Sequence, residues 1–358
     1  MRTRYPGLVA LTVAAACSHR PPADFTPDPA LIQRIRSLEI AAPTHACPGQ
    51  TFTTSYTAVL NDGSRMPFAT RYDRKHPPPL HVVFLERHST EAIALEDGGW
   101  ATERDPLTSA LTGFRLYAAL RANPAIGDSV VVPPSYECAR HAYTFTGETG
   151  EDGPDVVVRL GIVRSPFVNR LLVAQFDVAL APPFFVLADA DVVPPSDWLI
   201  VTSEGGRGAR GTKGRDGARG ANGAAGCPGG NGGAGGRGGD GLRGLNGGRG
   251  GRFTIMVPTE EPFLAGLVDA RSPGGEPGPG GSGGSGGAGG KGGAASGAQC
   301  AAGADGPAGQ PGKEGPPGGP GSPGGQPQIL TMRQPDVFGA NAPIELRDLL
   351  DYGRRRRP

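Results

Sequence analysis

Glycine occupies every third position from Gly205 to Gly250, through sixteen consecutive triplets. A three-residue period matches neither the 3.6-residue period of an α-helix nor the two-residue period of a β-strand. It is the period of an extended left-handed helix with three residues per turn, in which every third residue faces the same side. Glycine on that face has no Cβ, so another backbone can approach it closely. This part of the chain is therefore expected to pack backbone against backbone.

A second glycine-rich block runs from Gly274 to Gln326, and its triplets are regular again from Gly303 onward. Two architectures use this period. A collagen triple helix needs one glycine per triplet and gains stiffness from proline. In a polyglycine-II bundle, threefold helices of one chain exchange backbone hydrogen bonds through their glycine faces. Triplets such as Gly229-Gly230-Asn231 carry two bare faces, which suits an interior helix with several neighbours and gives collagen no stiffness.

Proline content also separates these architectures. Pro228 is the one proline of the first block, whereas Gly315-Pro316-Pro317 in the second block looks like collagen. We expect a polyglycine-II bundle folded from one chain, with a collagen-like homotrimer and a disordered glycine-rich linker as alternatives. The unbroken phase of the first block argues against the linker, because a flexible linker has no need of phase.

The residues that precede the repeats, 31–195, are expected to form a mainly β head. Short runs rich in β-branched and aromatic residues alternate there with turn residues, which is typical of strands. These runs are Thr51–Leu60, Leu80–Leu85, Gly113–Leu120, Asp155–Leu160, Arg170–Val178 and Phe184–Leu187. Their number and spacing predict a β-sandwich of immunoglobulin-like architecture. A small echo of the glycine period, Gly147 to Gly153, is predicted to be a surface loop.

Apolar runs also flank the blocks 205–252 and 274–326. They are Trp198–Thr202, Phe253–Val257 and Gln328–Met332. We expect a module over residues 196–334 in which these strands pair as a small sheet at the ends of the glycine-rich blocks. Residues 335–358 are predicted to form a short amphipathic helix, from Pro343 to Tyr352, and a basic tail.

The N-terminus has the succession of residue types that is typical of an export signal. Arg2 and Arg4 precede an apolar run, and small residues lead to Cys17. This order predicts a signal peptide over residues 1–16, a lipid on Cys17 and a polar tether over residues 17–30. Cleavage at an ordinary Ala-Xaa-Ala site, without lipidation, is the alternative.

Lipidation also fits the cysteine count. The chain has five cysteines, and a lipid on Cys17 leaves an even four: Cys47, Cys138, Cys227 and Cys300. Three pairings are open, and pairing within each half of the chain is the simplest. A Cys227–Cys300 bridge requires the two glycine-rich blocks to lie side by side with their midpoints aligned. Metal binding is not expected, because no two of these cysteines have Cys-Xaa-Xaa-Cys spacing.

The first block is strongly basic. Residues 205–252 contain nine bases and two acids, and the bases stand at non-glycine positions, among them Arg207, Arg210, Lys213 and Arg219. Such a row is attractive to an anionic polymer, so an adhesin that binds anionic glycan is the second functional hypothesis. The simpler interpretation is a solvated face that keeps glycine-rich backbone soluble. Aromatic residues are missing from this block, so specific nucleic-acid binding by base stacking is not expected.

The sequence offers no motif for catalysis. Gly-Xaa-Ser-Xaa-Gly occurs only inside the glycine repeat, at 280–284 and 283–287, where such matches carry no weight as a catalytic elbow, and no phosphate-binding loop ends in Gly-Lys-Ser or Gly-Lys-Thr. His76, His81 and His88 lie near Glu86 but match no known metal-ligand spacing. We therefore expect no enzyme, no cofactor and no metal site.

The two periodic blocks and the N-terminus together resemble bacterial collagen-like surface lipoproteins with Gly-Xaa-Yaa repeats. This resemblance implies a structural or surface-presenting protein of the cell envelope. It implies an outer-membrane anchor in particular, because Ser18 rather than aspartate follows Cys17. The family has no catalytic residues to carry over. The proline-poor Gly-Gly-Xaa triplets depart from its pattern and favour a bundle over a triple helix.

Overall fold

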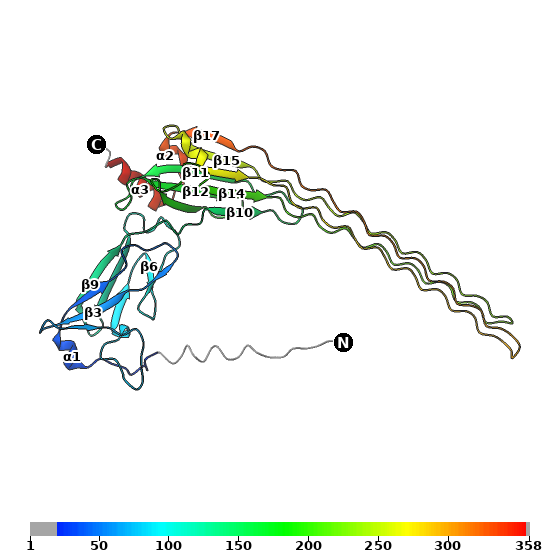
Figure 1. Ribbon diagram of the computed structural model, residues 1–358, viewed down its shortest axis with the longest axis horizontal. Coiled ribbons are helices and arrows are strands. Elements are labelled where there is room, and N and C mark those ends of the chain that lie inside the picture. Colours follow the sequence, from blue (N-terminus) through cyan, green and yellow to red (C-terminus); the bar gives the residue numbers. More distant parts are fainter. Residues whose placement is uncertain (1–19, 356–358) are drawn as a thin grey trace.

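A computed structural model describes residues 20–355. The fold is mainly β, with several small sheets and short helices, as the sequence predicts (Figure 1). The helices are α1 (Pro29–Arg34), α2 (Gln334–Val337) and α3 (Ile344–Arg355), and 3-10 helices span Val82–Phe84 and Pro262–Leu267. Helix α3 agrees with the predicted C-terminal helix and buries Leu346 and Leu349.

The N-terminal half contains three three-stranded sheets, ordered β1-β3-β4, β2-β7-β6 and β5-β8-β9. Their strands are β1 (Ile35–Ala41), β2 (Thr51–Phe52), β3 (Ser55–Leu60), β4 (Arg65–Pro67), β5 (Leu85–His88), β6 (Ala92–Ala94), β7 (Trp100–Thr102), β8 (Phe114–Leu120) and β9 (Asn123–Val132). Tyr56, Trp100 and Phe114 are fully buried among them. The predicted strand Leu80–Leu85 is instead mostly a 3-10 helix, because the side chain of His81 accepts the N–H of Val83 and starts a tight turn.

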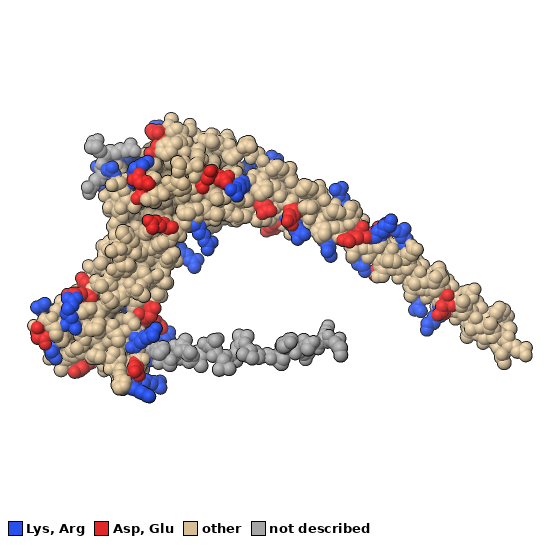
Figure 2. All heavy atoms as spheres, viewed as in Figure 1, with Lys and Arg blue, Asp and Glu red and all other residues tan. Residues whose placement is uncertain are grey.

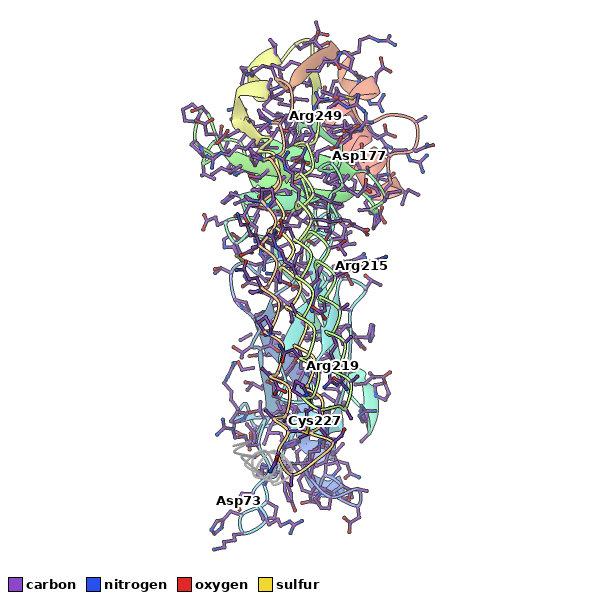
Figure 3. The ribbon with its side chains drawn as sticks, turned by 90° about the vertical axis from the view of Figure 1, so that its right-hand side faces the viewer. Asp73, Asp177, Arg215, Arg219, Cys227 and Arg249 are labelled. Atoms are coloured by element: carbon purple, nitrogen blue, oxygen red, sulfur yellow. A yellow bond between two sulfur atoms is a disulfide. The ribbon has the colours of Figure 1, made fainter. Side chains whose placement is uncertain are left out.

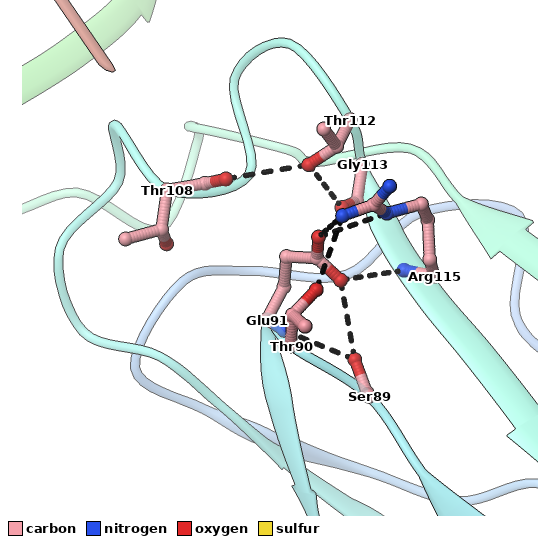
Figure 4. A network of polar contacts seen from close by, with 7 residues as sticks. All are labelled: Ser89, Thr90, Glu91, Thr108, Thr112, Gly113 and Arg115. Carbon is pink, nitrogen blue, oxygen red and sulfur yellow. Dashed lines mark hydrogen bonds and ion pairs between the residues drawn. The ribbon is translucent and has the colours of Figure 1, made fainter. Parts of the chain in front are cut away.

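An ion pair between the exposed Arg115 and the buried Glu91 links two parts of this half of the molecule (Figure 4). Arg115 on β8 donates through Nε and Nη2 to Oε1 of Glu91, which is only 4% exposed. Burial alone would raise the pKa of Glu91, yet the hydrogen bonds from Arg115 and Thr90 lower it below its ordinary value. The carboxylate therefore stays charged and links the strand edge at Glu91 to β8.

The C-terminal half contains two sheets that face each other across one core. The three-stranded sheet has the order β10-β14-β16, and the five-stranded sheet has the order β13-β12-β11-β15-β17. Their strands are β10 (Ala142–Thr146), β11 (Val156–Val163), β12 (Leu171–Val178), β13 (Phe184–Asp189), β14 (Leu199–Glu204), β15 (Phe253–Pro258), β16 (Val268–Arg271) and β17 (Gln328–Met332). Phe176, Leu199 and Phe253 pack in the shared core.

Strands from both sides of residue 195 share these two sheets. β10 pairs with β14, and β11 pairs with β15, in both cases in parallel. The sheets therefore run across the domain boundary that the sequence suggests between 31–195 and 196–334. Parallel pairs join strands that are distant in the chain, and a pattern of apolar runs does not reveal such pairs. The flanking strands also divide between the sheets, since β14 lies in one sheet and β15 and β17 lie in the other.

Four of these strands continue into the glycine-rich blocks, which form four extended segments. We name them T1 (205–226), T2 (229–251), T3 (272–295) and T4 (301–326). β14 leads into T1, T2 leads into β15, β16 leads into T3, and T4 leads into β17. T1 and T3 run away from the sheets and T2 and T4 return, so the four segments project together from these two sheets (Figure 1).

Backbone hydrogen bonds between the segments repeat at every third residue. T1 lies parallel to T3, as in the bond from Gly214 N–H to Ser282 O, and T2 lies parallel to T4, as in the bond from Gly238 N–H to Gln310 O. Antiparallel bonds join T2 to T1, T3 to T2 and T4 to T3. T2 and T3 therefore each contact three segments, whereas T1 and T4 each contact two. We call this assembly the bundle.

Candidate functional site: the surface of the bundle

Most glycines of the bundle stand where a neighbouring backbone leaves no room for a Cβ. A Cβ on Gly281 of T3 would overlap the carbonyl oxygen of Thr212 in T1, and a Cβ on Gly280 would overlap that of Gly315 in T4. T3 therefore needs two adjacent glycines in a triplet, because it is enclosed on both sides. This geometry explains the Gly-Gly-Xaa pattern of T3 and the single-glycine triplets of T1 and much of T4. In T2 it explains the first glycine of each triplet, since Leu242 and Leu245 occupy the second position.

Disulfide bonds join the cysteines within each half of the chain, as predicted. Cys47 pairs with Cys138, and Cys227 pairs with Cys300. The Cys227–Cys300 bond lies at the distal end of the bundle, where it connects the turn between T1 and T2 to the turn between T3 and T4 (Figure 3). The bond therefore closes the bundle at the end opposite the sheets.

Asparagine and aspartate side chains form a second set of contacts between segments, which the sequence analysis missed. All six such residues of the two blocks occupy the third position of a triplet, and each accepts a backbone N–H from a neighbouring segment. They are Asp216, Asn222, Asn231, Asp240, Asn246 and Asp305. Their acceptor groups satisfy N–H groups that the glycine ladder does not use. Their shared triplet position was the signal in the sequence.

The four basic residues singled out from the sequence lie on one row of T1. Arg207, Arg210, Lys213 and Arg219 occupy third positions of triplets, so they follow one another along the same side of the segment, beside T3. Arg207 lies 3.7 Å from Glu276, and Lys213 lies 2.9 Å from Asp216. Within residues 20–355, Arg210 and Arg219 have no acidic partner. Basic and acidic side chains are interspersed along the bundle (Figure 2).

Two aspartates make the bundle sensitive to acid. Hydrogen bonds from Lys213 and from the N–H of Ser285 lower the pKa of Asp216, and the N–H of Lys313 lowers the pKa of Asp240. A carboxyl group whose pKa is lower in the folded state stabilises that state above its unfolded pKa of about 3.9. That contribution is lost as the pH falls through the folded pKa.

We therefore expect the wild type to be more stable than the double variant Asp216→Asn/Asp240→Asn at pH 5 and to lose this advantage as the pH falls below about 3.9 and through the folded pKa. Asparagine keeps the Oδ1 acceptor and removes the charge, so the comparison isolates ionisation. Thermal unfolding midpoints at a series of pH values measure the difference. A constant gap between the two proteins down to pH 2 would contradict this assignment.

The predicted surface loop at Gly147–Gly153 lies against the base of the bundle. Gly150 N–H donates to Arg207 O, Gly206 N–H donates to Glu151 O, and Gly153 N–H donates to Arg249 O. Asp152 also accepts the N–H of Arg249 at 2.7 Å. The loop runs out beside T1, turns at Gly150, which has a φ of +80°, and returns beside T2. It thus adds a short layer to the outside of the bundle.

A cleft of about 830 Å³ lies where the two halves of the chain meet, and Tyr136, His141 and Trp198 are among the residues that line it. The Tyr136 hydroxyl is buried without a hydrogen-bond partner among residues 20–355, and burial raises its pKa. His81 is buried elsewhere, and His88 packs against Tyr117. No group of three or more metal-ligating side chains occurs within the described part of the chain.

The predicted signal peptide, and Cys17 with it, lies outside the described residues. Among residues 20–355, no helix has the length and apolar character needed to cross a membrane. No protein-family model matches this chain, and no curated protein matches its sequence.

Proposed function

We propose that this protein is a structural, surface-presenting lipoprotein of the cell envelope. Its glycine-rich half acts as a polyglycine-II bundle, a rigid spike that carries its exposed side chains away from an anchored N-terminus. The lipid on Cys17 and the outer-membrane location rest on the sequence alone. The role of the bundle as a spike rests on the backbone bonds described above.

One observation carries the proposal: a single chain supplies both partners of the backbone ladder. The N–H groups of T1, T2, T3 and T4 at every third residue reach carbonyls of the same chain. A collagen-like homotrimer would need those partners from two other chains. A ladder of this kind, closed by the Cys227–Cys300 bond, resists bending because each segment is tied to at least two others.

The glycan-binding alternative has less support. Of the four basic residues on the T1 row, Arg207 and Lys213 already have an acidic neighbour, so the row offers an anionic polymer fewer free cations than the sequence suggests. Paired charges on an exposed surface add little attraction for a distant anion. We therefore place surface presentation first and anionic glycan second.

The test is whether the distal end of the bundle is accessible on intact bacteria. An epitope inserted into the exposed turn at residues 296–299 marks that end without entering the ladder. We expect antibody to bind intact cells that express the full chain, and to bind equally well when Ser18 is replaced by alanine. Cys17→Ser should remove the epitope from the cells and release the protein. An epitope that is reached only after lysis, or one that Cys17→Ser leaves on the cells, would refute the proposal.

A further inference from the structure

The outer side of the bundle formed by T1 and T2 changes in character along its length. We call it the T1–T2 face. Its T1 row is Gly206, Ala209, Thr212, Arg215, Ala218, Ala221 and Ala224, and its T2 row is Gly248, Leu245, Leu242, Gly239, Gly236, Gly233 and Gly230. Residues 220–236 contain no charged side chain. The distal part of this face thus carries no charge and consists of glycine and small side chains.

At its base, this face already holds an extended segment. The loop 147–153 covers Gly206 and Gly248, where a Cβ would overlap the carbonyl oxygens of Glu148 and Glu151 respectively. The bonds that hold the loop use three outward-facing backbone groups of the bundle: the N–H of Gly206 and the carbonyl of Arg207 on T1, and the carbonyl of Arg249 on T2. The fold itself therefore shows which groups of this face receive an additional strand.

The equivalent backbone groups nearer the distal end of the bundle form no hydrogen bond within residues 20–355. Because the segments repeat every three residues, the N–H of Gly206 corresponds to those of Ala218, Ala221 and Ala224, and the carbonyl of Arg249 corresponds to those of Arg237 and Ala234. None of these groups takes part in a hydrogen bond within residues 20–355. They form a regular row of donors and acceptors, as the edge strand of a sheet does.

The glycines of the distal T2 row are not required by the bundle. A Cβ on Gly230 or Gly233 would come no closer than 3.2 Å to T1, whereas glycines inside the bundle admit no Cβ at all. Leu242 and Leu245 occupy the same row, with exposed fractions of 61% and 59%, and show that the row accepts a large side chain. Glycine there leaves room for a backbone from outside.

We propose that the distal T1–T2 face binds an extended Gly-Xaa-Yaa strand of another polypeptide, with the glycines of that strand toward Gly230–Gly239. The bound strand continues the layer that the loop 147–153 begins at the base. It gains backbone hydrogen bonds from T1 and T2, in the way that a peptide adds to the edge of a sheet. Arg215, Leu242 and Leu245 separate this distal site from the basal one.

The probe is a fluorescent peptide of about four Gly-Glu-Thr triplets, copied from Gly147-Glu148-Thr149. A peptide of the same composition with its glycines out of phase is the reference. Fluorescence anisotropy with the disulfide-intact protein should show saturable binding of the periodic peptide alone. Gly230→Leu/Gly233→Leu should weaken that binding by about tenfold or more, because leucine fills the space for the strand.

The matched control places two leucines on T4, near the same end of the bundle and outside the T1–T2 face. Ala302→Leu/Ala308→Leu, at two exposed positions, should bind the periodic peptide like the wild type, and circular dichroism checks that both variants keep the fold. Equal binding of the two peptides would overturn the proposal, as would unchanged binding by Gly230→Leu/Gly233→Leu. Light scattering measures whether the occupant is instead a second copy of this chain. If the wild type is a dimer and Gly230→Leu/Gly233→Leu is a monomer, the face serves self-association, and the proposed occupant is wrong.

Discussion

Replacing Cys227 and Cys300 by serine should destabilise the bundle by about 4 kcal/mol, the value expected for a bond that closes a loop of this size. The two cysteines are 73 residues apart in the chain. Without the bond, the two distal turns are held only by a few backbone contacts, such as the N–H of Ser296 to the carbonyl of Gly226. The bundle should therefore open from its distal end.

Limited trypsin digestion measures this opening locally, because the backbones of Arg219 and Arg237 belong to T1 and T2 near that end. Cleavage there should become much faster in Cys227→Ser/Cys300→Ser. The matched control is Cys47→Ser/Cys138→Ser, which removes a bond of similar span in the other half of the chain and should leave cleavage at Arg219 unchanged. Equal cleavage rates in the wild type and the bundle variant would show that the bond does not hold the bundle together.

Replacing Gly232 by alanine should cost about 3 kcal/mol, whereas the same change at the adjacent Gly233 should cost less than about 1 kcal/mol. A Cβ on Gly232 would overlap the carbonyl oxygen of Gly290 and lie 2.9 Å from the nitrogen of Gly306. A Cβ on Gly233 comes no closer than 3.2 Å to Ala221. Alanine at Gly233 also lowers the entropy of the unfolded chain, which offsets part of the cost.

Gly232→Ala and Gly233→Ala make a sharp comparison because the two variants have the same composition. The two residues are also adjacent in the sequence and lie at a similar distance from the disulfide. Urea unfolding followed by far-UV circular dichroism gives both free energies of unfolding. In a disordered linker the two substitutions would have the same small effect. Equal destabilisation by the two variants would contradict the arrangement of T1, T2 and T3.

The sequence predicted the glycine-rich half better than the head. Its three-residue period follows from the absence of room for a Cβ where one backbone meets another. The pairing of Cys227 with Cys300 was expected as part of the simplest of three open pairings, and the structure contains it. The parallel pairing of T1 with T3 was not predictable, because nothing in a glycine period distinguishes one neighbour from another. The continuation of β14 and β16 into T1 and T3 determines it.

The limits of the head were harder to predict, for a related reason. Val156–Val163 reads as a strand from its own residues, but its parallel partner β15 comes after the first glycine-rich block. Apolar runs identify strands and leave the choice of sheet to long-range packing. The basic row on T1 was visible in the sequence, whereas the ion pair of Arg207 with Glu276 depends on T3 lying beside T1. The immunoglobulin-like architecture of the head remains a prediction.

The most direct test of the single-chain bundle is the molar mass of the disulfide-intact protein in solution, measured by multi-angle light scattering. The structure predicts the mass of one chain over a wide range of concentration, since T1–T4 supply each other's backbone partners. A mass of three chains, which falls to that of one as the far-UV circular dichroism signal melts, would contradict the bundle and make the glycine-rich half a collagen-like rod.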